Sequence, residues 1–177
     1  MEKRIQYEQI TSLDPDWVRS QIGKFMAEDI PDGDVTTEAT VSGSIFVVAK
    51  MVAVDKFIFC GESIIPYCFP EPCLVDVKKK DGEWVQPGNT LAIITGPAGP
   101  ILTYERVTLN LIQRLSGIST ETKKYCDLNL PDHFKVMDTR KTTPGLRKFE
   151  KYSVSVGGGW NHRLDLTSGI LIKDNHL

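Results

Sequence analysis

A strand–helix–strand order near the C-terminal end of the chain constrains the fold most strongly. Residues 134–137 and residues 170–172 are short apolar runs that predict two buried strands. Between them, Thr143 as N-cap and Pro144 at the first helical position predict a helix that continues to about Val156, where three glycines end it. This order is typical of a βαβ unit, whose parallel strands collect polar groups at their carboxyl ends. In α/β barrels that edge carries the chemistry.

Basic side chains gather in the same region, at strand ends and in turns. They are Arg140, Lys141, Arg147, His162, Arg163 and Lys173. Residues 138–174 hold seven Lys and Arg against four Asp and Glu, although the net charge of the whole chain is −2. A locally basic region on an acidic chain fits a small anionic ligand better than nucleic acid, which is usually bound by globally basic proteins. The alternative is an ordinary charged surface exposed to water.

The length of 177 residues allows one domain or two small ones, each with a buried core. No run approaches the ~20 apolar residues that a transmembrane helix needs. Residues 1–17 carry charges but no apolar segment, so no secretory signal is predicted. We expect a cytoplasmic protein with reduced thiols, because neither CxxC nor zinc-type Cys/His spacing occurs around Cys60, Cys68, Cys73 and Cys126.

The first hundred residues predict a helix followed by a strand-rich α+β unit. Residues 16–28 have helical apolar spacing, and Asp14 followed by Pro15 is a helix-start signal. Turns are predicted at Asp81–Gly82 and Pro87–Gly88. Strands are predicted where β-branched or alternating apolar residues occur, at 45–54, 74–79 and 91–94.

A Gly- and Pro-rich break at residues 96–100 precedes an amphipathic helix over residues 101–119. One face of this helix is polar and carries Arg106, Asn110 and Gln113. The opposite face gathers Val107, Thr108, Leu111, Leu115 and Ile118. A single arginine on a polar face is usually just solvated, so Arg106 gains interest only from a further argument.

Several segments resemble consecutive motifs of the quinolinate phosphoribosyltransferase family, also called nicotinate-nucleotide pyrophosphorylases (carboxylating). They are YERVTLNLIQRLSGIST, DTRKTTPGLRKFEKYSV, GGGWNHR and ILIKDNH, together with EDIPDGDVTTEAT and DGEWVQPGNTLAIITGPAGPIL nearer the N-terminus. The resemblance extends from about Trp17 to the last residue.

The resemblance implies an α/β fold in which an open-faced α+β sandwich precedes an α/β barrel. We therefore expect a sandwich domain over residues 1–114 and the first, incomplete part of the barrel over residues 115–177. It also implies a homo-oligomer, a dimer or hexamer, in which the sandwich of one subunit covers the barrel site of another.

The activity that the resemblance implies is the transfer of phosphoribose from 5-phosphoribosyl-1-pyrophosphate, with Mg²⁺, to quinolinate. The products are nicotinate mononucleotide, pyrophosphate and CO₂, in NAD biosynthesis. Family members are longer by roughly a hundred residues, which carry the acidic groups for ribose and Mg²⁺ and the loops for the 5-phosphate. We therefore assign no metal ligand in this chain and expect little or no transferase activity from it alone.

The site residues follow from the matching motifs. Arginine suits bidentate contacts to carboxylates and phosphates, and lysine supplies a compact charge. The resemblance places Lys141 and Lys173 in catalytic roles, orienting quinolinate, assisting loss of its carboxylate and stabilising pyrophosphate. Arg106 matches an arginine that reaches the neighbouring subunit's site. The substrate-binding residues are Arg106, Thr139, Arg140, Lys141, His162, Arg163 and Lys173.

Some interpretations stay open at this point. His162 could be a packed structural histidine, and Asp174 could be a general base, a metal ligand or a structural residue. Asp165 stands where the family commonly has glycine, which predicts an extra negative charge near the anion site. Two other functions are a non-catalytic subunit that binds a full-length enzyme and a related pyrophosphorylase associated with molybdenum transport.

Overall fold

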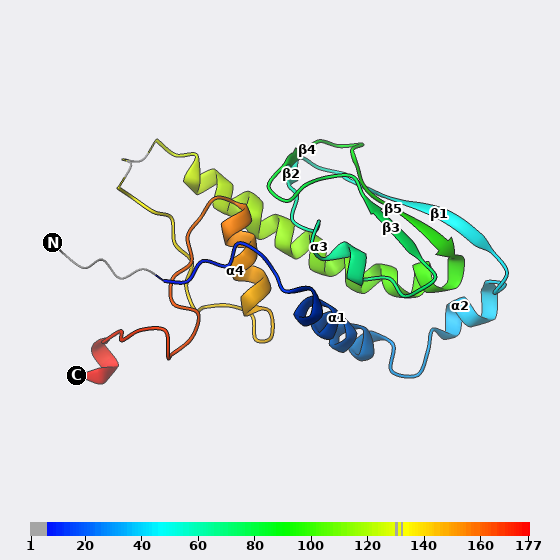
Figure 1. Cartoon of the computed structure of the whole chain (residues 1–177), viewed down its shortest axis with the longest axis horizontal. Helices are drawn as coiled ribbons and strands as arrows, with labels where there is room; N and C mark the ends of the chain where they lie inside the picture. The colour runs from blue at the N-terminus through cyan, green and yellow to red at the C-terminus, as the bar shows by residue number, and fades with distance from the viewer. Residues whose placement is uncertain (1–6, 130, 132) are drawn as a thin grey trace.

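The long helix α3 (Ala98–Cys126) organises the chain, and the other elements pack along it (Figure 1). In this computed structural model, residues 7–129, 131 and 133–177 are described. A three-stranded sheet lies on one side of α3, and helices α1 (Pro15–Asp29) and α4 (Arg147–Val156) lie on the other (Figure 1). Residues 1–6, part of the segment in which no secretory signal is predicted, lie outside the described residues.

Helix α1 forms as predicted. The Asp14 carboxylate accepts a hydrogen bond from Trp17 N at 2.8 Å, and Pro15 occupies the first turn, where no backbone donor is needed. The face that packs inward carries Val18, Ile22 and Met26. The sequence did not predict the short helix α2 (Val35–Thr40), which the side chain of Asp34 caps.

The sheet has the order β1-β5-β3, and both pairs are antiparallel: β1 (Phe46–Val52), β5 (Thr90–Pro97) and β3 (Leu74–Val77). All three strands overlap segments predicted to be strands. Two further strands, β2 (Phe57–Ile58) and β4 (Trp84–Val85), form a small antiparallel pair that was not predicted. The predicted turns contain Gly82 and Gly88, both with positive φ.

One face of the sheet packs against α3 and the other is open. Leu91 and Ile94 of β5 are buried in the core, whereas Phe46 and Val48 of β1 are each 63% exposed and Leu74 of β3 is 71% exposed. This arrangement confirms the open-faced sandwich. The fully buried centre of the core contains Val18, Phe59, Ile64, Ile65, Val85, Leu115 and Phe149.

Helix α3 begins at Ala98, inside the segment predicted to be a break, and continues to Cys126. Pro100 is tolerated because the backbone N–H groups of a first helical turn have no partner within the helix. Arg106, Asn110 and Gln113 are exposed, as the polar face predicted. Of the helices in the described part of the chain, none has the length and apolar composition needed to cross a membrane.

All four cysteines are free thiols, as predicted. Cys60 and Cys68 are buried. Removal from water disfavours a thiolate, and this burial raises the pKa of each of these two thiols to about 12. Cys73 and Cys126 are only partly buried.

The prediction of two regular strands near the C-terminal end, at residues 134–137 and 170–172, is wrong. Residues 134–137 contribute one parallel bridge, Met137 with Trp160, in which Trp160 N donates to Val136 O at 2.8 Å. Residues 170–172 are irregular, and Ile170 is 90% exposed. A strand is stable only beside a hydrogen-bonded neighbour, and no described segment pairs with residues 170–172.

Helix α4 begins at Arg147, three residues later than predicted. Gly145 has a φ of +83°, outside the helical region, so residues 143–146 form a turn closed by Leu146 N donating to Thr143 O at 3.0 Å. The predicted N-cap role of Thr143 is therefore wrong, because Leu146 precedes the helix and no side chain caps it.

A buried ion pair holds this region together where regular strands are absent. Lys151 on α4 is fully buried, and its ammonium group donates to the Asp138 carboxylate and to His162 O, the latter at 3.0 Å. Asp138 Oδ1 also accepts from His162 N, and Asp138 Oδ2 accepts from the side chain of Asn161, each at 2.8 Å. This cluster fixes the position of residue 138 relative to residues 161–162.

The glycines after α4 allow it to approach α3 closely. A Cβ added to Gly157 would lie 2.5 Å from Ser119 O and 2.7 Å from Thr122 Cβ. The φ of Gly157 is −75°, so space rather than backbone conformation requires a glycine at this position.

We predict that Gly157→Ala destabilises the chain by about 1–3 kcal/mol, the usual cost of overpacking a closely packed contact. Gly117→Ala is the matched control, because a Cβ at this α3 position meets nothing within 4 Å. The control should be neutral or stabilising, since alanine is the better helix former. Urea unfolding measures both variants, and equal stability of the two would contradict this account.

We predict that Lys151→Met and Asp138→Asn each lower the free energy of unfolding, Lys151→Met by about 3–5 kcal/mol because it leaves a buried carboxylate without its counter-charge. The double variant should lose less than the sum of the two single losses, since neither charge is then left alone. Urea unfolding of all four proteins tests the pair, and strictly additive losses would rule out the coupling.

Candidate functional site

A hollow of about 370 Å³ near the C-terminal end collects the site residues predicted from that region. Its lining consists of Asp138, Thr139, Arg140, Lys141, His162, Arg163, Leu171 and Lys173. Arg106, on the exposed face of α3, is not among the described residues of this lining. Arg147 does not line it either, among the residues described, and instead donates to the Thr142 hydroxyl at 3.0 Å.

The segment that follows the Met137 bridge supplies one wall of the hollow. The hydroxyl of Thr139 accepts a hydrogen bond from Lys141 N at 3.0 Å, which bends the backbone around Arg140. Arg140 is half-buried and Lys141 is exposed. The predicted collection of polar groups at a strand end is therefore present, although the strand is reduced to a single bridge.

The segment held by Lys151 supplies another part of the lining. Arg163 is buried, and its Nη1 donates to Gly169 O at 2.8 Å. Within the described residues this is the hydrogen bond that its guanidinium makes, so its other donors can contact a ligand. His162 is half-buried, and its backbone N–H and carbonyl are both bonded to the Asp138–Lys151 pair. His162 therefore lines the hollow with its backbone fixed from both sides.

The cations of the hollow have no acidic partner in the described part of the chain. None of Arg140, Lys141, Arg163 and Lys173 lies within 4.0 Å of a described carboxylate. Asp138 is the acidic residue of the lining, and Lys151 neutralises it. The hollow therefore carries a positive potential that attracts anions.

Arg140 adds a more specific signal. Its Nε is shielded from water and finds no hydrogen-bond acceptor among the described residues. Such a buried donor costs about 1–3 kcal/mol when it is left unsatisfied. Unsatisfied buried groups are rare in folded proteins, and this one lies in a residue that lines an anion-attracting hollow. A bound carboxylate would supply the acceptor.

Lys173 lies in the lining near the C-terminal end, and its neighbours have structural roles. Its backbone N–H donates to the imidazole of His176 at 3.2 Å, and Asp174 begins the 3-10 helix η2 (Asp174–His176). For Asp174, this placement favours the structural interpretation over a general base or metal ligand.

Asp165 does not lie among the described lining residues, so its charge does not enter the hollow as expected. Its carboxylate accepts hydrogen bonds from the hydroxyl and backbone N–H groups of Thr167 and Ser168, at 2.7 to 3.0 Å. The bond from the Thr167 hydroxyl is the main cause that lowers the pKa of Asp165 to about 2. Its charge stabilises its own turn.

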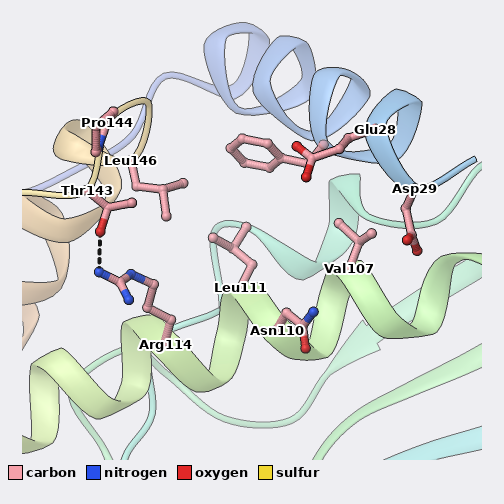
Figure 2. Close-up of a pocket in the computed structure, with 10 residues that line it drawn as sticks. Glu28, Asp29, Val107, Asn110, Leu111, Arg114, Thr143, Pro144 and Leu146 are labelled. Carbon is pink, nitrogen blue, oxygen red and sulfur yellow. Dashed lines mark hydrogen bonds between the residues drawn. The ribbon is translucent and has the colours of Figure 1, made fainter.

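A second hollow, of about 440 Å³, lies between α1, α3 and residues 143–146 (Figure 2). At one end, Arg114 Nη2 donates to the Thr143 hydroxyl at 2.5 Å (Figure 2). Arg114 Nε also donates to Glu150 Oε1 at 2.9 Å. Thr143 N donates to Glu150 Oε2 at 3.2 Å. These hydrogen bonds attach the turn at residues 143–146, which follows Arg140 and Lys141, to α3 and α4.

The environment of Glu150 supports this attachment. Burial acts to raise its pKa, but hydrogen bonds from Arg114 and Thr143 outweigh burial and hold the pKa below its ordinary value. Sequence reasoning missed Arg114, Glu150 and Lys151, because no local pattern in a single sequence distinguishes them from solvated charges.

Comparisons with known proteins agree with the resemblance. The sequence model described as quinolinate phosphoribosyl transferase, N-terminal domain, matches residues 34–116, and that of the C-terminal domain matches residues 118–177. The two matches meet inside α3; the boundary at residues 114–115 stays a prediction.

Relatives from two bacteria are similar over most of this chain. It is 44% identical over 163 residues to the probable nicotinate-nucleotide pyrophosphorylase (carboxylating) of Bacillus subtilis (strain 168), covering 90% of this chain and 56% of the relative. It is 39% identical over 168 residues to the nicotinate-nucleotide pyrophosphorylase (carboxylating) of Mycobacterium leprae (strain TN), covering 92% and 59%. The chain thus spans somewhat more than half the length of these relatives.

Solved structures are similar in fold. The nicotinate-nucleotide pyrophosphorylase of Francisella tularensis superposes with a TM-score of 0.88 and 34% identity, over 97% of this chain and 63% of that one. NadC from Streptococcus pyogenes superposes with a TM-score of 0.86 and 35% identity, over 94% and 60%. The chain belongs to the quinolinate phosphoribosyltransferase family.

Proposed function

We propose that this chain supplies the quinolinate-binding part of an enzyme that transfers phosphoribose from 5-phosphoribosyl-1-pyrophosphate to quinolinate with loss of CO₂, in NAD biosynthesis. The observation that carries the proposal is the hollow itself, where, among the described residues, four cations converge without an acidic partner and Arg140 Nε has no hydrogen-bond acceptor. Quinolinate, with two adjacent carboxylates, provides the acceptors that these groups lack.

The cations divide into two groups by burial. Arg140 is half-buried and Arg163 is buried. A guanidinium that is partly shielded from water binds a carboxylate strongly and with fixed geometry. We assign these two to carboxylate recognition, with Thr139 and His162 as hydrogen-bonding neighbours. Lys141 and Lys173 are exposed, which suits charges that act on the reacting groups.

The proposed reaction forms a bond between the ring nitrogen of quinolinate and C1 of the ribose, as the bond from C1 to pyrophosphate breaks. The 2-carboxylate then leaves as CO₂, and the electron pair at C2 takes up a proton. In this scheme Lys141 and Lys173 hold the quinolinate dianion in orientation and stabilise the negative charge of the departing pyrophosphate. They favour the transfer by position and charge.

Magnesium enters the proposal only as a companion of the diphosphate substrate. Within the described residues, no three His, Cys, Asp or Glu side chains lie close enough together to hold a metal ion. Asp138, the acidic residue of the hollow, is bonded to Lys151. The described residues therefore do not fit a Mg²⁺ site, and no step is assigned to the ion here.

Arg106 fits a role between subunits better than a role in its own hollow. It lies on the exposed face of α3 and outside the described lining of the hollow. We propose that it reaches the hollow of a second copy in a homo-oligomer, a dimer or hexamer. A cytoplasmic location is proposed as well, on the support of the four free thiols.

We predict that quinolinate binds the wild-type chain and that Arg140→Gln weakens binding about tenfold or more, the loss expected for one hydrogen-bonded charge. Isothermal titration calorimetry measures both dissociation constants. Arg19→Gln is the matched control, because it makes the same change of charge at a largely exposed arginine on α1. Equal weakening by both variants would refute a specific role for Arg140.

We also predict that nicotinate, which lacks the 2-carboxylate, binds at least about tenfold more weakly than quinolinate, because half of the acceptor groups are absent. Calorimetry at fixed pH and salt concentration compares the two ligands. Indistinguishable affinities would show that the hollow attracts charge without recognising a dicarboxylate.

A further inference from the structure

The N-terminal strap, residues 7–10, lies against residues 161–162 although more than 150 positions separate them in the sequence. The amide side chain of Gln9 pairs with both backbone polar groups of Asn161: Gln9 Nε2 donates to Asn161 O at 3.0 Å, and Asn161 N donates to Gln9 Oε1 at 2.8 Å. Ile10 N donates to Asn161 Oδ1 at 2.6 Å. Because Asn161 is 1% exposed, these bonds satisfy groups that water does not reach.

The strap brings an aromatic ring against His162, one of the residues that line the hollow. The rings of Tyr7 and His162 have centroids 4.4 Å apart and planes tilted by 36°. Gln9 Nε2 also donates to Tyr7 O at 2.9 Å, which fixes the backbone that carries the tyrosine. Contact of this kind between two rings is favourable beyond the burial of their surface.

Tyr7 contacts the turn that binds Arg163 as well. A Cβ added to Gly169 would lie 3.4 Å from Tyr7 Cε1, so the tyrosine ring packs closely on this turn. Gly169 O is the acceptor of the hydrogen bond from Arg163 Nη1. The Tyr7 ring therefore contacts His162 directly and also contacts Gly169, whose carbonyl binds Arg163.

The hydrogen bonds of His162 fix its backbone but not the rotation of its imidazole ring. The backbone of His162 is fixed from both sides, because its N–H donates to Asp138 and its carbonyl accepts from Lys151. Among the hydrogen bonds of the described residues, none involves the imidazole ring of His162. The Tyr7 ring packs against the imidazole and so restricts its rotation.

We propose that Tyr7 is a positioning residue, which holds the imidazole of His162 in its orientation in the hollow, and that Gln9 anchors Tyr7 there. This inference rests on the proposed function of the hollow. A side chain held in place before the ligand arrives loses less conformational freedom on binding, so the strap should increase the affinity for quinolinate.

The first test is the ring-proton NMR spectrum of the histidines in the 177-residue chain. In Tyr7→Leu, the Cδ2 and Cε1 proton signals of His162 should move, because the ring current of the tyrosine is lost. In Tyr7→Phe the ring remains, and these signals should stay close to their wild-type positions. The signals of His133 and His176 serve as internal controls and should not move.

The second test is quinolinate binding by calorimetry. Tyr7→Leu should weaken binding about two- to tenfold, the range expected for losing one immobilised side chain, and Tyr7→Phe should restore affinity to near the wild-type value. If Tyr7→Leu fails to fold, Gln9→Ala takes its place, since it removes both bonds to Asn161 and keeps the tyrosine. It should shift the same His162 signals and weaken binding.

The outcomes separate this inference from the function on which it rests. Unmoved His162 signals in Tyr7→Leu, or unchanged affinity despite moved signals, would overturn the positioning role. A wild-type chain that binds no quinolinate would instead refute the proposed function, while the ring signals would still decide whether Tyr7 holds the imidazole.

Discussion

The ion pair between Lys151 and Asp138 is the interaction on which the C-terminal part of the structure depends. Burying an ammonium group is costly unless its donors are satisfied, and Lys151 Nζ donates both to Asp138 and to His162 O. Asp138 in turn accepts from His162 N and from Asn161. The cluster therefore fixes both parts of the lining of the hollow. It also occupies the carboxylate of the lining, so that the remaining cations stay available for a ligand.

Much of the fold could be predicted because local patterns agree with tertiary structure. The cap at Asp14 and the polar face around Asn110 depend on neighbouring residues alone, and α1 and α3 form where these signals occur. Arg140 and Arg163 were predicted as site residues from motifs, and both line the hollow. Their roles in binding quinolinate stay predictions.

The features that could not be predicted depend on distant partners. Residues 170–172 are apolar, but a strand also needs a neighbour, which the described part of the chain does not supply. The burial of Lys151 depends on Asp138 and on residue 162, and the contacts of Asn161 depend on a segment more than 150 positions away. The start of α4 could not be predicted either, because the positive φ of Gly145 delays the helix to Arg147.

Burial also determines how strongly each cation of the hollow can act. Charges in contact with water interact weakly, whereas the same charges gain strength where water is excluded. Arg163 is buried and Arg140 is partly buried, so these two should supply most of the affinity for a dicarboxylate. Lys141 and Lys173 are exposed, and their charges should become effective only when a bound ligand or a second protein surface excludes water from them.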